Sequence, residues 1–185
     1  TEALRMGVDI ELLRQWLKSY DHNNITIGVV ASHSSLQILH GARLEGFRTL
    51  GIAVGENRRK IYSAFPGADP DEWLMLDSYR EMLDYAEWFR ENNVIIIPHG
   101  SLVEYLGSTN FKSLQVPTFG NRGILHWESS RERQRQWLEK GGCSMPKVID
   151  DPHEIDGPVI VKYAGEQKAE RVISLPEITE ILEET

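Results

Sequence analysis

Two adjoining pieces of sequence set the architecture of this chain: the apolar run Ile25-Thr26-Ile27-Gly28-Val29-Val30 and the polar turn Ala31-Ser32-His33-Ser34-Ser35 directly after it. The run is almost continuous and rich in β-branched residues, which is typical of a central strand covered on both faces. A helical pattern then continues from Leu36 to about Gly46, and a second strand is expected over residues 47–54. Strand, turn, helix and strand in this order predict a parallel crossover unit.

The same alternation continues along the chain. Three further elements are expected, namely an amphipathic helix over residues 9–20, a helix over residues 79–91, and a buried strand over residues 94–97 that ends in Pro98-His99-Gly100-Ser101. Residues 55–70 contain glycine, proline and the basic cluster Arg58-Arg59-Lys60, and are expected to be mostly loop. The sequence therefore predicts an α/β fold with a Rossmann-like, open and mostly parallel sheet that has helices on both faces.

The character of the sequence changes near Trp127. Beyond this point we expect a charged helix over residues 128–140, short strands over residues 145–148 and 159–162, and a short acidic helix over residues 175–185. We therefore predict three parts, which are an N-terminal helix (residues 1–24), a Rossmann-like nucleotide-binding domain (residues 25–126) and a second, incomplete unit (residues 127–185).

Charge and composition limit the classes of partner. The net charge of −8 argues against nucleic acid, because binding a phosphate backbone requires a concentrated basic face. Cys143 is the single cysteine and the apolar runs are too short to cross a bilayer, so we expect a cytoplasmic protein without disulfide or membrane segment. The carboxylates of Asp150, Asp151, Glu154 and Asp156 have the mixed spacing of a solvated acidic turn, which we favour over a metal site. The sequence leaves open whether the chain forms a homo-oligomer.

Two polar turns follow predicted strands, one over residues 32–35 and the other over residues 99–101. In open α/β sheets, ligands bind beyond the carboxyl ends of the strands, where turns direct backbone N–H groups and helix N-termini outwards. Taken singly, each turn is better explained by serines that cap helices and by histidines satisfied in loops. Two such turns at one edge of a sheet instead favour a crevice for a phosphate or a ribose, lined by hydroxyl donors and imidazoles.

Three motifs in these regions resemble those of archaeal FAICAR synthetases, and they occur in the order and spacing of that family. The motifs are Ala31-Ser32-His33-Ser34-Ser35-Leu36-Gln37-Ile38-Leu39 with Gly41-Ala42 and Glu45-Gly46-Phe47, then Ile97-Pro98-His99-Gly100-Ser101 with Tyr105 and Gly107, and last Phe119-Gly120-Asn121-Arg122 with Ile124-Leu125 and Trp127-Glu128. The similarity covers residues 25–165, which is most of this chain and the first part of the family's length.

This resemblance implies a ligase of the ATP-grasp type, in which a Rossmann-like front domain precedes two lobes that close over ATP and Mg²⁺. It implies that residues 127–185 are a partial ATP-grasp lobe. Members of the family join formate to the amine of AICAR at the expense of ATP, through formyl phosphate, and yield FAICAR in purine biosynthesis. The family's AICAR-binding histidine and serine fall on His33 and Ser101, and its ATP-contacting lysine falls on Lys162. Arg122 in the third motif is a further candidate for an anion contact to AICAR, with a surface ion pair as the equal alternative.

The chain departs from the family pattern after Gly165. The family continues there into a glycine-rich, basic loop, whereas this sequence reads Glu166-Gln167-Lys168-Ala169-Glu170-Arg171 and has no counterpart of the carboxylates that hold Mg²⁺. Two alternatives stay open: a ligase, complete or truncated, that uses AICAR, formate and ATP, and a natural short relative that binds AICAR or a similar nucleotide without catalysis. A plain α/β interaction domain, which would bind neither ligand, is a third hypothesis.

Overall fold

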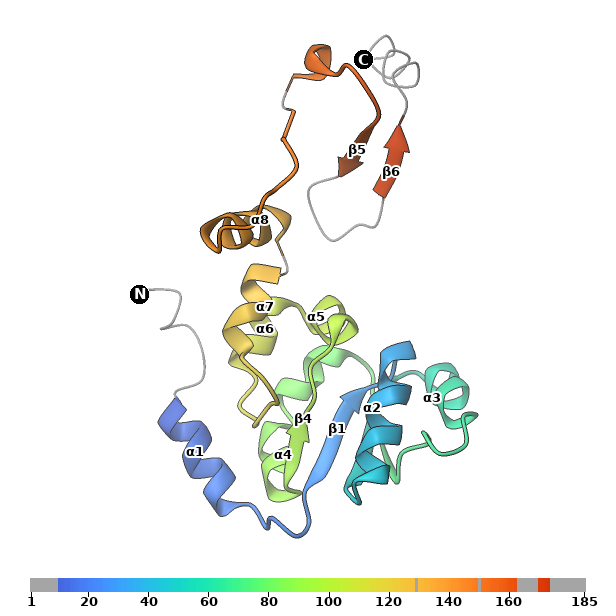
Figure 1. Ribbon diagram of the computed structural model, residues 1–185. Helices are drawn as coiled ribbons and strands as arrows, with labels where there is room; N and C mark the ends of the chain where they lie inside the picture. Colours follow the sequence, from blue (N-terminus) through green and yellow to red (C-terminus); the bar gives the residue numbers. More distant parts are fainter. Residues whose placement is uncertain (1–9, 129, 150, 163–169, 174–185) are drawn as a thin grey trace. The chain divides into compact units, whose positions relative to one another are not determined.

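The computed structural model describes residues 10–128, 130–149, 151–162 and 170–173 (Figure 1). The chain divides into two units, Thr1–His126 and Trp127–Thr185. Within the described ranges the helices and strands are, in chain order, α1 (Ile10–Ser19), β1 (Thr26–Val30), α2 (His33–Leu44), β2 (Arg48–Val54), α3 (Glu56–Ser63), β3 (Glu72–Leu76), the 3₁₀-helix η2 (Tyr79–Leu83), α4 (Ala86–Glu91), β4 (Val94–Ile96), α5 (Gly100–Leu106), α6 (Ser108–Ser113), α7 (Arg122–Glu128), α8 (Arg131–Lys140), the 3₁₀-helix η3 (Pro152–Glu154), β5 (Val159–Lys162) and β6 (Glu170–Ile173).

The first unit is built on a four-stranded sheet in the order β3-β2-β1-β4, and all neighbouring strands in it are parallel. β1 lies inside the sheet, with Gly28 aligned to Leu50 of β2 on one side and to Ile96 of β4 on the other. The chain runs outward from β1 to β3 and then returns to the far side of β1, so the strand order reverses between β1 and β4. This arrangement confirms the predicted α/β fold with a Rossmann-like open parallel sheet.

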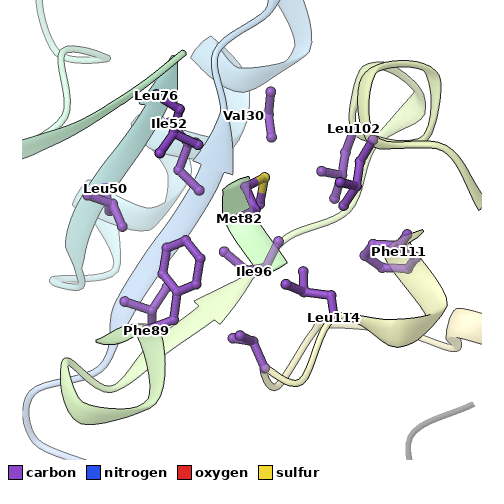
Figure 2. Close-up of a cluster of buried hydrophobic side chains, with 13 residues drawn as sticks. Val30, Leu50, Ile52, Leu76, Met82, Phe89, Ile96, Leu102, Phe111 and Leu114 are labelled. Atoms are coloured by element: carbon purple, nitrogen blue, oxygen red, sulfur yellow. The ribbon is translucent and has the colours of Figure 1, made fainter. Parts of the chain in front are cut away.

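An apolar core on one face of the sheet holds the first unit together. Figure 2 shows side chains of the sheet, among them Ile52 and Ile96, on the same side as those of α5, α6 and the segment after α6. Gly28 leaves room for this packing, because a Cβ atom there would lie 2.7 Å from Val94 Cγ1 and 2.8 Å from Ile96 Cδ1. The buried cluster comprises Val30, Leu50, Ile52, Leu76, Met82, Phe89, Val94, Ile96, Leu102, Leu106, Phe111, Leu114 and Val116.

The opposite face of the sheet is covered by α2, which packs on β1 and β2 and buries Leu39. Strand alternation directs Ala53 and Gly51 of β2 to this face. The space over Gly51 is filled, because a Cβ atom there would lie 2.7 Å from the Trp73 ring and 2.8 Å from Pro70 Cγ. Both faces of the central strands are therefore buried, as the continuous apolar run over β1 predicts.

Most elements expected in the first unit are confirmed. The helix over residues 9–20 corresponds to α1, the helical pattern from Leu36 lies within α2, and the three expected strands correspond to β1, β2 and β4. The helix expected over residues 79–91 is confirmed only in part, because it is divided into η2 and α4. η2 has its own cap, in which the Ser78 hydroxyl accepts from the Arg80 N–H at 3.3 Å.

The prediction of a loop over residues 55–70 is wrong for its first half. α3 forms there, and its sequence, ENRRKIYS, has no apolar stripe by which helical spacing could be recognised. β3 is not anticipated either, because it is an edge strand in which Leu76 is the one buried residue. α6 and α7 likewise have no predicted counterpart.

The second unit contains α8, η3 and the antiparallel pair of β5 and β6. α8 confirms most of the helix expected over residues 128–140, and β5 confirms the strand expected over residues 159–162. The strand expected over residues 145–148 is wrong, since these residues have no strand partner within the described ranges. Pro146 lacks the N–H group that a strand ladder needs.

Some predictions for the second unit concern residues next to or outside the described ranges. Residues 170–173 form β6, which is not predicted from the sequence. The acidic helix expected over residues 175–185, and Asp150 of the carboxylate cluster, lie outside the described residues. The division into an N-terminal helix, a nucleotide-binding domain and a partial ATP-grasp lobe stays a prediction.

Replacement of Gly51 by alanine should lower the free energy of unfolding by about 1–3 kcal/mol, because the new methyl group would collide with the packed Trp73 ring. Gly41→Ala is the matched control. Gly41 lies inside α2 with nothing within 4 Å of the new Cβ atom, so this change should raise the free energy of unfolding by about 0.5–1 kcal/mol. Urea denaturation measures both values, and equal effects of the two substitutions would contradict this packing.

Candidate functional site

The reversal of strand order between β1 and β4 marks the position at which open α/β sheets bind ligands. Since the strands are parallel, their carboxyl ends lie at one edge, and in Figure 1 the arrowheads of β1 and β4 point to the same edge, toward α5. His33 is the first residue of α2 and Ser101 is the second residue of α5. His33 and Ser101, two of the residues with predicted AICAR contacts, therefore follow neighbouring strands.

The turn after β1 is short, because α2 begins directly after its N-cap residue Ser32. Ser35 closes this turn, since its hydroxyl donates to the Ser32 carbonyl at 2.6 Å and accepts from the Ser32 N–H at 3.1 Å. The Ser32 hydroxyl itself is buried and has no hydrogen-bond partner among the described residues. His33 is exposed. The capping explanation thus holds for Ser35, whereas Ser32 and His33 keep hydrogen-bonding capacity.

His99 connects the turn after β4 to the end of β1. It is the N-cap residue of α5, and its Nε2 lies 3.0 Å from the Val30 carbonyl oxygen. A carbonyl can only accept, so Nε2 carries the proton and Nδ1 is an acceptor. This Nδ1 atom is buried without a partner in the part of the chain that the structure describes.

The charge state of His99 follows from its surroundings. Burial lowers the pKa of His99 below its ordinary value of 6.5, the hydrogen bond to Val30 opposes this effect, and the nearby His33 reinforces it. The imidazole is therefore mainly neutral at neutral pH. Ser101, two residues further along, is half-buried. A neutral imidazole and a hydroxyl thus stand at the start of α5.

Arg58 of α3 lies over the same edge of the sheet. Its Nη1 donates to the Ala31 carbonyl at 2.9 Å and to the Tyr105 hydroxyl at 3.1 Å, and its guanidinium carbon lies 4.8 Å from the centre of the Tyr105 ring. The Tyr105 ring stacks on Tyr79, with ring centres 4.9 Å apart. Burial acts to lower the pKa of Arg58, but the hydrogen bond to Tyr105 and the neighbouring tyrosines raise it above its usual value. The guanidinium is therefore charged.

Arg122 is almost buried, with 8% of its surface exposed. Its Nε donates to the Thr118 hydroxyl at 2.9 Å, and its terminal nitrogens donate to the carbonyls of Leu114 and Val116. Burial lowers the pKa of Arg122 to about 10. The surface ion pair considered for Arg122 is therefore wrong. Its contacts hold the segment between α6 and α7, and an anion contact to AICAR stays a prediction.

Lys162 is the last residue of β5 and aligns with Glu170 of β6. Its side chain is outside what the structure describes, so the expected contact with ATP stays a prediction. In the described ranges no group of three or more histidine, cysteine, aspartate and glutamate residues could hold a metal ion. No helix among the residues with a described structure has the length and apolar character needed to cross a membrane.

Two surface hollows of the first unit lie away from the polar turns. One, of about 480 Å³, is lined by Asp84, Tyr85, Glu87, Trp88 and Glu91. The other, of about 210 Å³, is lined by Leu13, Leu17, Ile95, Pro117, Thr118, Phe119 and Gly120. Neither contains His33, Ser101 or Arg58, so the candidate site is defined by its polar groups at the sheet edge.

Sequence patterns miss Arg58, because α3 has no apolar stripe and its residues were expected in a loop. A usable signal exists, since Arg58 follows the end of the apolar strand β2 by four residues and therefore lies at the same edge as the two polar turns. Ser32 and His99 stand in the predicted turns, but their unpaired atoms are visible only in the structure. Ser35 differs from these two residues because its hydroxyl is hydrogen-bonded within the turn, and this difference depends on packing that the spacing of residues in the sequence does not reveal.

The first unit shares its class of fold with a solved enzyme. N5-carboxyaminoimidazole synthetase from Staphylococcus aureus matches with a TM-score of 0.61 over 84% of this chain and 44% of that protein, at 14% sequence identity. At this identity the match concerns the fold alone. Fold and sheet edge together define an α/β protein with a Rossmann-like sheet, with polar groups at the strand reversal where folds of this class bind ligands.

The family follows from sequence comparison. Residues 27–149 match DUF1246, a family described as a protein of unknown function, and the chain belongs to this family. The 5-formaminoimidazole-4-carboxamide-1-(beta)-D-ribofuranosyl 5'-monophosphate synthetases of Methanosarcina acetivorans and Methanosarcina barkeri are 60% and 58% identical to it over 151 residues, which are 82% of this chain and 42% of each relative. The synthetase of the same name from Archaeoglobus fulgidus is 43% identical over 176 residues, 93% of this chain and 48% of the relative. These names confirm the resemblance to archaeal FAICAR synthetases, and the chain spans less than half the length of these curated relatives.

Acidification should destabilise the protein through His99. Its pKa is lowered in the folded state, so the unfolded chain takes up the proton first, and the free energy of unfolding should fall as pH drops below 6.5. His99→Gln removes the titrating group and should make this pH dependence shallower. Urea denaturation at a series of pH values measures the slope. The control is His22→Gln, an exposed histidine whose Nε2 also lies near a carbonyl, and an identical slope in both variants would contradict the assignment.

Substitution of Arg122 by methionine should affect stability directly. The change removes the hydrogen-bond donor of two buried carbonyls. Each carbonyl left unpaired should lower the free energy of unfolding by about 1–3 kcal/mol. Arg80→Met, at an exposed position of η2, is the control and should change the value by less than about 0.5 kcal/mol. Chemical denaturation decides the matter, because equal stability of Arg122→Met and wild type would exclude a structural role for Arg122.

Proposed function

We propose that this chain is the AICAR-binding front part of an ATP- and formate-dependent ligase that converts AICAR to FAICAR in purine biosynthesis. The names of the archaeal relatives support this proposal and favour a ligase over a non-catalytic nucleotide-binding module. The Rossmann-like sheet, which also occurs in a synthetase of known structure, agrees with a front domain of the ATP-grasp type. A cytoplasmic location is part of the proposal, because phosphorylated substrates do not cross membranes unaided.

The observation that carries the proposal is the hydrogen bond of 3.0 Å between His99 Nε2 and the Val30 carbonyl. It joins the carboxyl ends of β1 and β4, from which α2 and α5 start with His33 and Ser101 near their first residues. Neither side chain is used in a hydrogen bond within the described structure, in contrast to Ser35. A ligand at this edge would therefore meet donors and acceptors from both turns at once.

Each residue then has a distinct role toward AICAR. The exposed His33 imidazole would hydrogen-bond the carboxamide or the ribose, for which it can serve as donor and as acceptor. Ser101 would donate its hydroxyl to the 5′-phosphate, together with backbone N–H groups at the start of α5. Binding of this kind orients the AICAR amine for attack on the carbonyl carbon of formyl phosphate. The new C–N bond forms as phosphate leaves and the amine loses a proton.

The proposed binding of ATP and formate involves residues outside those whose side chains the structure describes. ATP, when bound, supplies the phosphoryl group that activates formate, and Lys162 is the residue proposed to contact it. The described residues do not fit Mg²⁺, since they contain no suitable group of ligands. The proposal therefore assigns Mg²⁺ to no residue of the described ranges.

Calorimetry with AICAR tests the proposal. His33→Ala should weaken AICAR binding about tenfold, and Ser101→Ala, which removes a hydrogen bond to a charged phosphate, about 10- to 100-fold. His40→Ala and Ser113→Ala are matched controls at exposed positions and should bind AICAR as the wild type does. Formation of FAICAR and ADP on addition of formate and Mg-ATP would extend the result from binding to the ligase reaction.

Two outcomes would contradict the proposal. The first is a wild-type chain that shows no AICAR binding, and the second is unchanged affinity in both His33→Ala and Ser101→Ala. Thermal denaturation of each variant verifies that a loss of affinity does not arise from loss of the fold.

A further inference from the structure

Arg58 is a half-buried cation without a carboxylate partner in the described structure. The groups that act on its charge are the hydroxyls of Tyr62, Tyr79 and Tyr105. Arg59, the next residue, is different, because it pairs with the Glu56 carboxylate at 2.7 Å. A partly desolvated guanidinium without a counter-ion is costly unless an anion joins it. Arg58 therefore has the electrostatic character of an anion-binding group.

The hydrogen bonds of Arg58 leave part of its guanidinium available. Both recorded bonds, to the Ala31 carbonyl and the Tyr105 hydroxyl, come from Nη1. A guanidinium carries five N–H donors, so Nη2 and Nε keep the paired donors that bind a phosphate in bidentate fashion. The contact with the Tyr105 ring restricts the side chain, which reduces the entropy that binding would cost.

The position of Arg58 connects it to the proposed AICAR site. Its partner Ala31 directly follows β1, and its partner Tyr105 lies on α5, four residues after Ser101. Residues four apart share one face of a helix, so Tyr105 and Ser101 face the same side of α5. Tyr79, which stacks on Tyr105, follows β3. Residues from the segments that follow the four strands thus form one polar cluster around Arg58.

We propose that Arg58 binds the 5′-phosphate of the ribonucleotide at this sheet edge, and that Tyr105 is a positioning residue that holds the guanidinium for it. This inference rests on the proposed function, of which it names a further binding residue. The phosphate lies between Ser101 and Arg58 in this arrangement, and His33 contacts the other end of the ligand. Arg58 thereby distinguishes the monophosphate from the nucleoside.

Calorimetry on the 185-residue chain with AICAR and with its nucleoside, which lacks the phosphate, tests the role of Arg58. Arg58→Gln should weaken binding of AICAR about 10- to 100-fold, the effect of losing a charge-assisted hydrogen bond, and leave nucleoside binding within about twofold. Arg58→Lys keeps the charge without the paired donors and should give an intermediate loss. Tyr105→Phe keeps the stacked ring but not the hydroxyl, and should weaken AICAR binding about 2- to 10-fold.

Arg59→Gln is the matched control, because Arg59 is the neighbouring arginine of α3 and already has its carboxylate. It should bind both ligands as the wild type does. Equal affinity of wild type, Arg58→Gln and Arg58→Lys for AICAR would overturn the inference, as would an equal loss of affinity for AICAR and for the nucleoside. Circular dichroism of each variant shows whether the fold is kept, and Arg58→Lys decides the matter where Arg58→Gln does not fold.

A second measurement separates this inference from the proposed function. Methyl phosphate is titrated into isotope-labelled wild-type chain, and the Nε–H resonance of Arg58 is followed by NMR. A saturable shift of this resonance, absent from that of Arg59, is expected whether or not AICAR binds. A wild type that binds methyl phosphate at Arg58 but not AICAR would contradict the proposed function alone. A resonance of Arg58 that does not respond to methyl phosphate would overturn the inference about Arg58.

Discussion

Parallel pairing of β1 on both of its sides is the constraint from which the rest of this structure follows. It requires an apolar strand buried on two faces, which residues 26–30 supply, and it places every strand end of the sheet at one edge. The strand order reverses between β1 and β4, which is the position at which open α/β sheets bind ligands. The hydrogen bond from His99 to the Val30 carbonyl joins the segment after β4 to the end of β1.

Basic side chains lie near the polar sheet edge, although the protein as a whole carries a net charge of −8. The Arg122 guanidinium is hydrogen-bonded by main-chain carbonyls inside the fold, whereas Arg58 is surrounded by tyrosines and one carbonyl. His99 is kept neutral by burial. Among the described residues no carboxylate pairs with Arg58, so a negatively charged ligand would meet no competing side chain from them at this guanidinium.

The sequence predicts the central part of the fold well, because β1, β2 and β4 carry a strong apolar signal and stand next to distinct turns. It fails where an element is stabilised by its position and not by its own pattern, as in the polar helix α3 and the edge strand β3. The same limit applies to the site. Resemblance supplies His33 and Ser101, but the orphaned atoms of Ser32 and His99 depend on packing between separate elements. For Arg122 the sequence motif suggests a ligand contact, but the structure shows that its guanidinium donates hydrogen bonds within the fold.

Gly28 links the apolar interior to the polar edge. Side chains of β4, those of Val94 and Ile96, occupy the volume in which a side chain of residue 28 would stand. Two residues further along the same strand, the Val30 carbonyl accepts the hydrogen bond from His99 Nε2. The alignment of the two turns thus depends on the absence of a side chain at Gly28, in the middle of the sheet. A larger residue at position 28 would therefore push β1 and β4 apart, and it would displace the two polar turns without any change in the sequence of the turns themselves.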